Sequence, residues 1–199
     1  MEPAQKKHGH FRVLPRWSMT KCRIAGMAGF VVFASAVAAA EVTLEKLMND
    51  PKLTPRRFAN HFADFDYEYQ VYVQPAEKFL AARSGDCDDY AVLADHVLKQ
   101  KGYRTRLIHI RMVGMYAHAV CYVAENKAYL DYNNRKYTIN LEKCGPTLRD
   151  IAEKVAKTAE ANWTSVTEFT YSYEEDRKKM GITVVKTEPP ENDPDRRKG

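Results

Sequence analysis

A cysteine stands at the start of a predicted helix, within the segment Gly85-Asp86-Cys87-Asp88-Asp89. Asp86 is a suitable N-cap, because its carboxylate can accept a backbone N–H from the first turn. The partial positive charge at a helix N-terminus favours thiolate over thiol, and the thiolate is the nucleophilic form of cysteine. The amides of this turn can also stabilise the oxyanion of an acyl-transfer intermediate. Cys87 is therefore a candidate nucleophile.

The acids next to this cysteine have several possible roles. Negative charge on Asp88 and Asp89 disfavours a neighbouring thiolate, so a catalytic Cys87 needs a base or an imidazolium to offset it. Helix capping by itself explains acids at a helix start. A hard cation such as calcium also binds carboxylate oxygens, although three acids in four residues do not specify a site. We expect no cofactor and assign no metal ligand.

Later in the chain, His118 and Asp131 are candidates for the base that activates Cys87 and for the group that orients this base. His118 opens a predicted strand, and Asp131 lies inside the next strand, where an acid usually has a partner. A two-residue turn at 126–127 would place Asp131 opposite Tyr122, four residues from His118 along the same face. A turn centred between residues 124 and 125 would place Asp131 directly opposite His118. The alternatives are a structural histidine and an acid that bonds to nearby tyrosines or to the turn.

The elements that position these residues follow from hydrophobic spacing and helix-breaking residues. The sequence predicts helices over 43–49, 56–65, 75–83, 87–100 and 148–161. It predicts strands over 67–73, 104–112, 117–123, 128–132, 163–173 and 182–186. Helices that precede mostly antiparallel strands indicate an α+β domain, in which the cysteine helix packs on an antiparallel sheet.

Three segments together resemble the motifs of the transglutaminase-like superfamily, and bacterial transglutaminase-like cysteine peptidases in particular. They are the segment 85–91 (GDCDDYA), the segment 117–120 (AHAV) and the segment 129–133 (YLDYN), and the resemblance covers roughly residues 65–135. The resemblance implies a papain-like, transglutaminase-like core. It also implies a triad in which Cys87 is the nucleophile, His118 the base that later protonates the leaving amine, and Asp131 the group that orients His118.

The resemblance further implies thiol-dependent acyl transfer on peptide or isopeptide amides through a thioester, ending in hydrolysis or in transfer to an amine. Relatives often carry a tryptophan a dozen or more residues before the cysteine, whereas this sequence has Tyr72-Val73-Gln74-Pro75 there. Tyr72 and Gln74 are therefore our candidates for the second oxyanion donor. The alternative is a non-catalytic binding module that retains the fold.

The first 40 residues have the pattern of an export signal. A basic stretch ends at Arg23, an apolar run occupies 24–37, and Ala38-Ala39-Ala40 follows with a small-x-small cleavage pattern. The apolar run is shorter than the roughly 20 residues that span a bilayer as a helix. We predict cleavage after Ala40 and a periplasmic or secreted protein without stable membrane insertion. An uncleaved membrane helix is the alternative, and Met19 is an alternative start.

The basic excess of the chain belongs to this N-terminal segment. Residues 1–40 hold six of the 31 basic residues and one of the 26 acidic residues, so the rest of the chain has 25 of each. A neutral body has no overall field to attract a polyanion. We therefore expect a protein or peptide substrate and no nucleic acid, and the sequence leaves the oligomeric state open.

Cleavage would leave three cysteines in the exported chain. An odd number leaves at least one thiol unpaired, and a Cys121–Cys144 disulfide would leave Cys87 free. The alternative is three reduced cysteines that behave as small hydrophobic residues. The charged, proline-rich tail 188–199 has no apolar anchor and is predicted to be disordered, which gives a transglutaminase-like domain over 41–187.

Overall fold

The structure is a computed structural model that describes residues 41–138 and 140–187. The predicted signal peptide 1–40 and the predicted disordered tail 188–199 lie outside the described residues. Within the described residues, no helix has both the length and the apolar character needed to cross a membrane.

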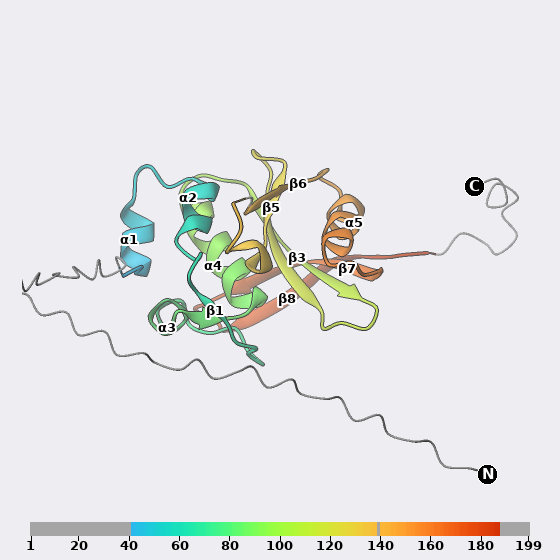
Figure 1. The fold of residues 1–199 in the computed structure, drawn as a ribbon, viewed down its shortest axis with the longest axis horizontal. Helices are drawn as coiled ribbons and strands as arrows, with labels where there is room; N and C mark the ends of the chain where they lie inside the picture. The colour runs from blue at the N-terminus through green and yellow to red at the C-terminus, as the bar shows by residue number, and fades with distance from the viewer. Residues whose placement is uncertain (1–40, 139, 188–199) are drawn as a thin grey trace, which may run out of the picture. The chain divides into compact units, whose positions relative to one another are not determined.

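A six-stranded sheet carries the fold, and all of its neighbouring strands are antiparallel (Figure 1). The strand order is β6-β5-β4-β3-β7-β8. The strands are β3 (Thr105–Met112), β4 (His118–Val123), β5 (Ala128–Leu130), β6 (Leu141–Lys143), β7 (Trp163–Ser172) and β8 (Arg177–Val185). The predicted antiparallel sheet is thereby confirmed.

Helices cover both faces of this sheet and make three layers (Figure 1). One face packs against α1 (Leu44–Asn49), α2 (Pro55–Asn60), α3 (Ala76–Ala82) and α4 (Cys87–Gln100), and the other against α5 (Leu148–Thr158). Strand β4 contributes to the cores on both faces of the sheet, because successive side chains point to opposite faces. Cys121 packs in the core under α4, while its neighbours Val120 and Tyr122 pack in the core under α5. The α+β class predicted for the chain is confirmed.

Two elements differ from the sequence prediction in the segment that leads to Cys87. Helix α2 ends at Asn60, although the later phenylalanines Phe62 and Phe65 remain fully buried beyond its end. The predicted strand 67–73 is reduced to β1 (Asp66–Tyr67), which pairs in parallel with β2 (Ser84–Gly85). Backbone amides in the rest of this segment bond to side chains of α4 and of its N-cap instead of to a neighbouring strand.

Two further differences lie at the edges of the sheet. Strand β6 was not predicted, since only one of its three residues is buried and so short a strand has no clear alternation. Strand β8 begins at Arg177, five residues before the predicted start, because the tight β7–β8 hairpin extends the pairing through Ser172 and Arg177.

The turn between β4 and β5 differs from both predicted turns. It contains the four residues 124–127, and it pairs Cys121 with Leu130 and Val123 with Ala128. The amide of Lys127 donates to the Ala124 carbonyl over 3.1 Å, and Lys127 has a φ of 46° in the left-handed region. Asp131 follows directly on Leu130, so the observed register leaves it diagonal to His118 on the same face of the two strands.

Candidate active site

The first turn of α4 is closed by a reciprocal capping box. The Asp86 carboxylate accepts the backbone N–H groups of Asp88 at 2.9 Å and Asp89 at 3.4 Å, and the Asp89 carboxylate accepts the N–H of Asp86 at 3.1 Å. Cys87 is the first residue of the helix and is buried, with 9% of its surface exposed. The sulfur is therefore attached where the partial positive charge of α4 is concentrated.

The same acids also hold the segment that runs past the cysteine. Asp86 accepts the backbone N–H of Gln70 at 3.0 Å, and Asp89 accepts that of Gln74 at 2.6 Å. Burial, the largest effect, raises the pKa of Asp86, while its backbone hydrogen bonds lower it. Asp88 has a different role, since it forms an ion pair with Lys178 at 3.1 Å on the partly exposed side of the helix.

The structure does not bring the two predicted oxyanion donors to Cys87. The side-chain amide of Gln74 donates to the Ser84 carbonyl at 3.2 Å and to Asp89 at 3.0 Å, which uses both of its N–H groups. The Tyr72 side chain points to solvent and is 82% exposed. Neither residue lines the cavity that contains Cys87.

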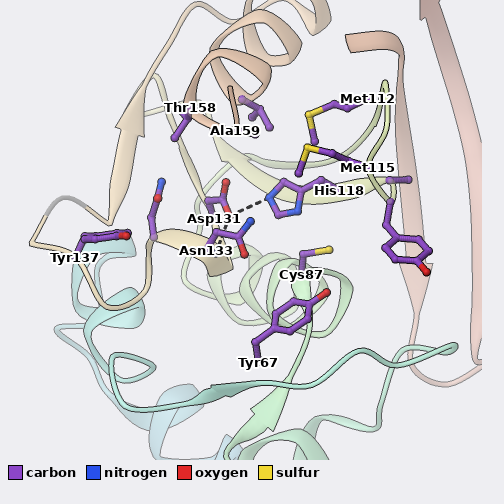
Figure 2. Close-up of a pocket in the computed structure, with 14 residues that line it drawn as sticks. Tyr67, Cys87, Met112, Met115, His118, Asp131, Asn133, Tyr137, Thr158 and Ala159 are labelled. Carbon is purple, nitrogen blue, oxygen red and sulfur yellow. Dashed lines mark hydrogen bonds and ion pairs between the residues drawn. The ribbon is translucent and has the colours of Figure 1, made fainter. Parts of the chain in front are cut away.

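His118 and Asp131 form a buried pair in that cavity (Figure 2). The Nε2 atom of His118 lies 2.9 Å from Oδ1 of Asp131, and the two residues are 8% and 4% exposed. The same carboxylate oxygen accepts the N–H of Asn133 at 2.8 Å and thereby caps the short helix η1 (Tyr132–Asn134). The carboxylate position is fixed from two sides, and Nδ1 of His118 remains available for Cys87.

The electrostatics of this pair favour a charged histidine. Burial is the largest single effect and lowers the pKa of His118, but the charge of Asp131, its hydrogen bond and the adjacent Cys87 together outweigh burial. The pKa of His118 is therefore raised well above its ordinary value. The acids of α4 disfavour a thiolate at Cys87, and an imidazolium beside the sulfur offsets their negative charge.

A cavity of about 700 Å³ opens at the end of the sheet where β3 stops and β4 begins. It receives Cys87 from α4 on one side and residues from the end of α5 on the other (Figure 2). Its remaining lining is Tyr67, Met112, Met115, Tyr116, Ala117, Asn133, Asn134, Tyr137, Val155, Thr158 and Ala159. Apart from the His118–Asp131 pair, no charged side chain of the described residues lines it, so the cavity suits an uncharged, partly apolar group.

The other two cysteines lie elsewhere and have raised pKa values. Burial raises the pKa of Cys121 well above its usual value, and it raises the pKa of Cys144 to about 11. Cys121 packs in the core under α4, whereas Cys144 packs against the core under α5. The three cysteines that the structure describes are all free thiols, so the disulfide alternative is wrong and the reduced alternative holds.

Sequence reasoning missed Tyr67 and the methionine-rich wall of the cavity. Tyr67 is one of several tyrosines between residues 67 and 72, and spacing alone cannot separate it from the others in an irregular segment. Its pairing with β2 and its place in the cavity lining distinguish it from Tyr69 and Tyr72. In the described part of the chain, no group of three or more histidine, cysteine or acidic residues is arranged to hold a metal ion.

The chain is similar to several solved structures. Among solved structures, the chain is similar to calcium-bound LapG of Legionella pneumophila, with 17% identity, a TM-score of 0.41 and coverage of 62% of this chain and 68% of that one. For EGTA-treated LapG the identity is 16%, the TM-score 0.42 and the coverage 69% and 75%. For a candidate cysteine protease of Cytophaga hutchinsonii the corresponding values are 15%, 0.33, 72% and 48%.

No curated protein matches the chain. A family profile described as a transglutaminase-like domain matches residues 45–162, which is more than half of the sequence and lies inside the domain predicted over 41–187. The chain therefore belongs to the transglutaminase-like family.

Proposed function

We propose that this protein is an exported thiol enzyme that acts on peptide or isopeptide amides through Cys87, His118 and Asp131. The observation that carries the proposal is the buried His118–Asp131 pair, which lines the same cavity as a cysteine at a helix N-terminus. The proposed nucleophile lies on α4, the proposed base on β4 and the proposed orienting group directly after β5, and all three line one cavity.

The proposed reaction begins with a thiolate–imidazolium pair. The Cys87 sulfur attacks the amide carbon, a C–S bond forms, and the carbonyl π electrons move to the oxygen. When the carbonyl re-forms, the C–N bond breaks and His118 gives its proton to the leaving amine. The neutral His118 then removes a proton from water or from a second amine that attacks the thioester, which regenerates the thiolate and the imidazolium. Asp131 stays ionised and holds the ring in place.

The character of the cavity supports a neutral acyl group. Methionine, tyrosine and alanine side chains line the part formed by β3, β4 and the loop between them, whereas amide and hydroxyl groups line the part near η1. A peptide or isopeptide with an uncharged side chain next to the reacting carbonyl fits this lining better than a charged group, which would lose its hydration without gaining a partner.

Alkylation of the protein that starts at Glu41 tests this proposal. Iodoacetamide near neutral pH, followed by peptide mass mapping, should modify Cys87 first, since burial raises the pKa values of Cys121 and Cys144. An ordinary thiol is only a few per cent thiolate near pH 7, so a thiolate–imidazolium pair should react about ten times faster or more. His118→Ala should remove that advantage.

His96→Ala is the matched control, because His96 lies on the same helix as Cys87 but faces Tyr173, with the ring centroids 5.3 Å apart. It should leave the alkylation rate unchanged. If wild-type Cys87 reacts no faster than an ordinary free thiol, the enzyme proposal fails and a binding module that retains the fold becomes the better account.

A further inference from the structure

We propose that the phenol hydroxyl of Tyr67 and the backbone N–H of Cys87 together form the oxyanion hole of this site. The inference rests on the proposed function of Cys87 and assigns the second donor, which the sequence alone placed at Tyr72 or Gln74. Three features carry it: the backbone that fixes Tyr67, the direction of its side chain and the state of its hydroxyl.

The backbone at Tyr67 is tied to the strand that leads into the nucleophile. Tyr67 is the parallel partner of Gly85, which precedes Cys87 by two residues. The flanking amides complete the ladder, since Asp66 donates to the Arg83 carbonyl at 2.9 Å and Glu68 donates to the Gly85 carbonyl at 2.8 Å. The position of Tyr67 relative to Cys87 is therefore set by main-chain hydrogen bonds.

Gly85 permits close packing around the start of α4. A Cβ atom at this position would lie 2.5 Å from an Asp89 carboxylate oxygen and 2.7 Å from the ring of Phe79. Any side chain here would displace the Asp89 carboxylate, which closes the capping box, or the ring of Phe79 on α3. The bonds from Gln70 and Gln74 to the acids at the start of α4 hold the continuation of the same segment.

The side chain of Tyr67 points into the reaction cavity. Figure 2 shows Cys87 between the His118 ring and the Tyr67 ring, with the phenol oxygen directed toward the side on which the sulfur lies. The Tyr67 ring lies beside the Tyr132 ring, with the two ring centroids 6.5 Å apart. During amide cleavage the leaving nitrogen must face His118 to receive its proton, so the carbonyl oxygen is left on the side away from His118, where Tyr67 lies.

The Tyr67 hydroxyl is free to donate. The Tyr67 side chain borders the cavity and is 54% exposed, and its hydroxyl has no hydrogen-bond partner among the described residues. Partial burial, followed by the charges of Cys87 and Asp86, raises the pKa of Tyr67, so the phenol keeps its proton at neutral pH. The Cys87 amide is the other candidate donor, because the Asp86 carboxylate bonds to the next two amides of the turn and not to this one.

In the proposed step, the thiolate electron pair forms the C–S bond and the carbonyl π pair moves to oxygen. Tyr67 donates a hydrogen bond to that oxygen and keeps its proton throughout. Collapse of the intermediate restores the carbonyl, and the amine departs with the proton from His118. Tyr67 therefore acts only in steps that create an oxyanion.

Tyr67→Phe separates this role from others, since it removes the hydroxyl and keeps the ring. Two small probes react with the same sulfur, one without an oxyanion intermediate and one through it. Iodoacetamide alkylates Cys87 at a CH2 carbon without an oxyanion, whereas p-nitrophenyl acetate acetylates it through one. We expect the alkylation rate of Tyr67→Phe to stay within about twofold of wild type, and the acetylation rate to fall about 10- to 100-fold, since losing one oxyanion donor typically costs at least this much.

Tyr69→Phe is the matched control, because Tyr69 is a nearby exposed tyrosine that does not line the cavity, and both rates should be unchanged. Equal falls in both rates for Tyr67→Phe, or no fall in acetylation, would overturn the oxyanion assignment. A wild-type Cys87 that alkylates like a free thiol would instead overturn the proposed function, so the two failures are distinguishable.

Discussion

At the scale of single residues, the charge of Asp131 is the largest effect that raises the pKa of His118. The hydrogen bond between Nε2 and Oδ1 is 2.9 Å long and the pair is buried, so replacement of Asp131 by the neutral, similarly shaped asparagine leaves burial as the dominant effect. In Asp131→Asn we expect the pKa of His118 to fall below its ordinary value. NMR titration of the histidine Cε1–H signals measures this, and the rate of Cys87 alkylation near pH 7 should fall with it.

The same substitution should lower the free energy of unfolding by an amount that depends on pH. The folded-state pKa of His118 is raised above the unfolded value, so the pair stabilises the fold fully below about pH 6.5, and the contribution is lost as pH rises through the higher folded pKa. Urea unfolding should show Asp131→Asn less stable by about 1–3 kcal/mol at pH 6, with a smaller difference at high pH. A difference that grew with pH would contradict the assignment.

Alternation of side chains was sufficient to predict that His118 and Asp131 share a face, but not how they meet. The predicted turns placed them four residues apart or directly opposite, and the structure has the intermediate register. The four-residue turn depends on Lys127 in a left-handed conformation, and nothing in the residue type of lysine signals that. The position of Cys87 beside His118 and Asp131 depends on how α4 packs on the face of the sheet, a tertiary feature that no strand pattern contains.

At the scale of elements, acids at the start of α4 hold the segment 70–74 in place through hydrogen bonds. Asp89 accepts the main-chain and side-chain N–H groups of Gln74 and the N–H of Asp86, and it is 1% exposed. Removing its carboxylate leaves these donors without their acceptor, so Asp89→Ala should lower the free energy of unfolding by about 2–4 kcal/mol. Chemical denaturation measures the loss.

Asp88→Ala is the control for this prediction, because it changes the same residue type in the same turn. Its main contact is a partly exposed ion pair with Lys178, which contributes about 0–1 kcal/mol. Equal losses for the two variants would contradict the idea that Asp89 fixes the preceding segment at Gln74. Capping by acids was predictable from the sequence, whereas this second role was not, since the bonded residues Gln70 and Gln74 are about 15 residues away.

At the scale of the molecule, the sequence predicted that the cysteine helix packs on an antiparallel sheet, but not that helices cover both faces of the sheet. Helix α5 buries the apolar side that its spacing predicted, whereas α4 is buried around most of its surface, because α1, α2 and α3 pack on it as well as the sheet. Edge strands were less predictable, since β6 and β8 bury few side chains and so leave little pattern to read.

The boundaries of the domain give the last prediction. Val42 is buried and Thr43 caps α1, immediately after the cleavage point expected at Ala40, and β8 completes the sheet before residue 187. A protein of residues 41–187 should therefore melt within about 2 °C of one that continues to residue 199, a shift that corresponds to under about 1 kcal/mol. A protein ending at Ser172 loses β8, which pairs with β7 along most of its length, and should melt far lower or fail to fold. Circular dichroism melts of the three proteins test the boundary. A melting temperature about 5 °C or more lower for 41–187 would mean that the tail contributes to the folded domain. An unchanged melting temperature for the protein ending at Ser172 would mean that β8 does not contribute.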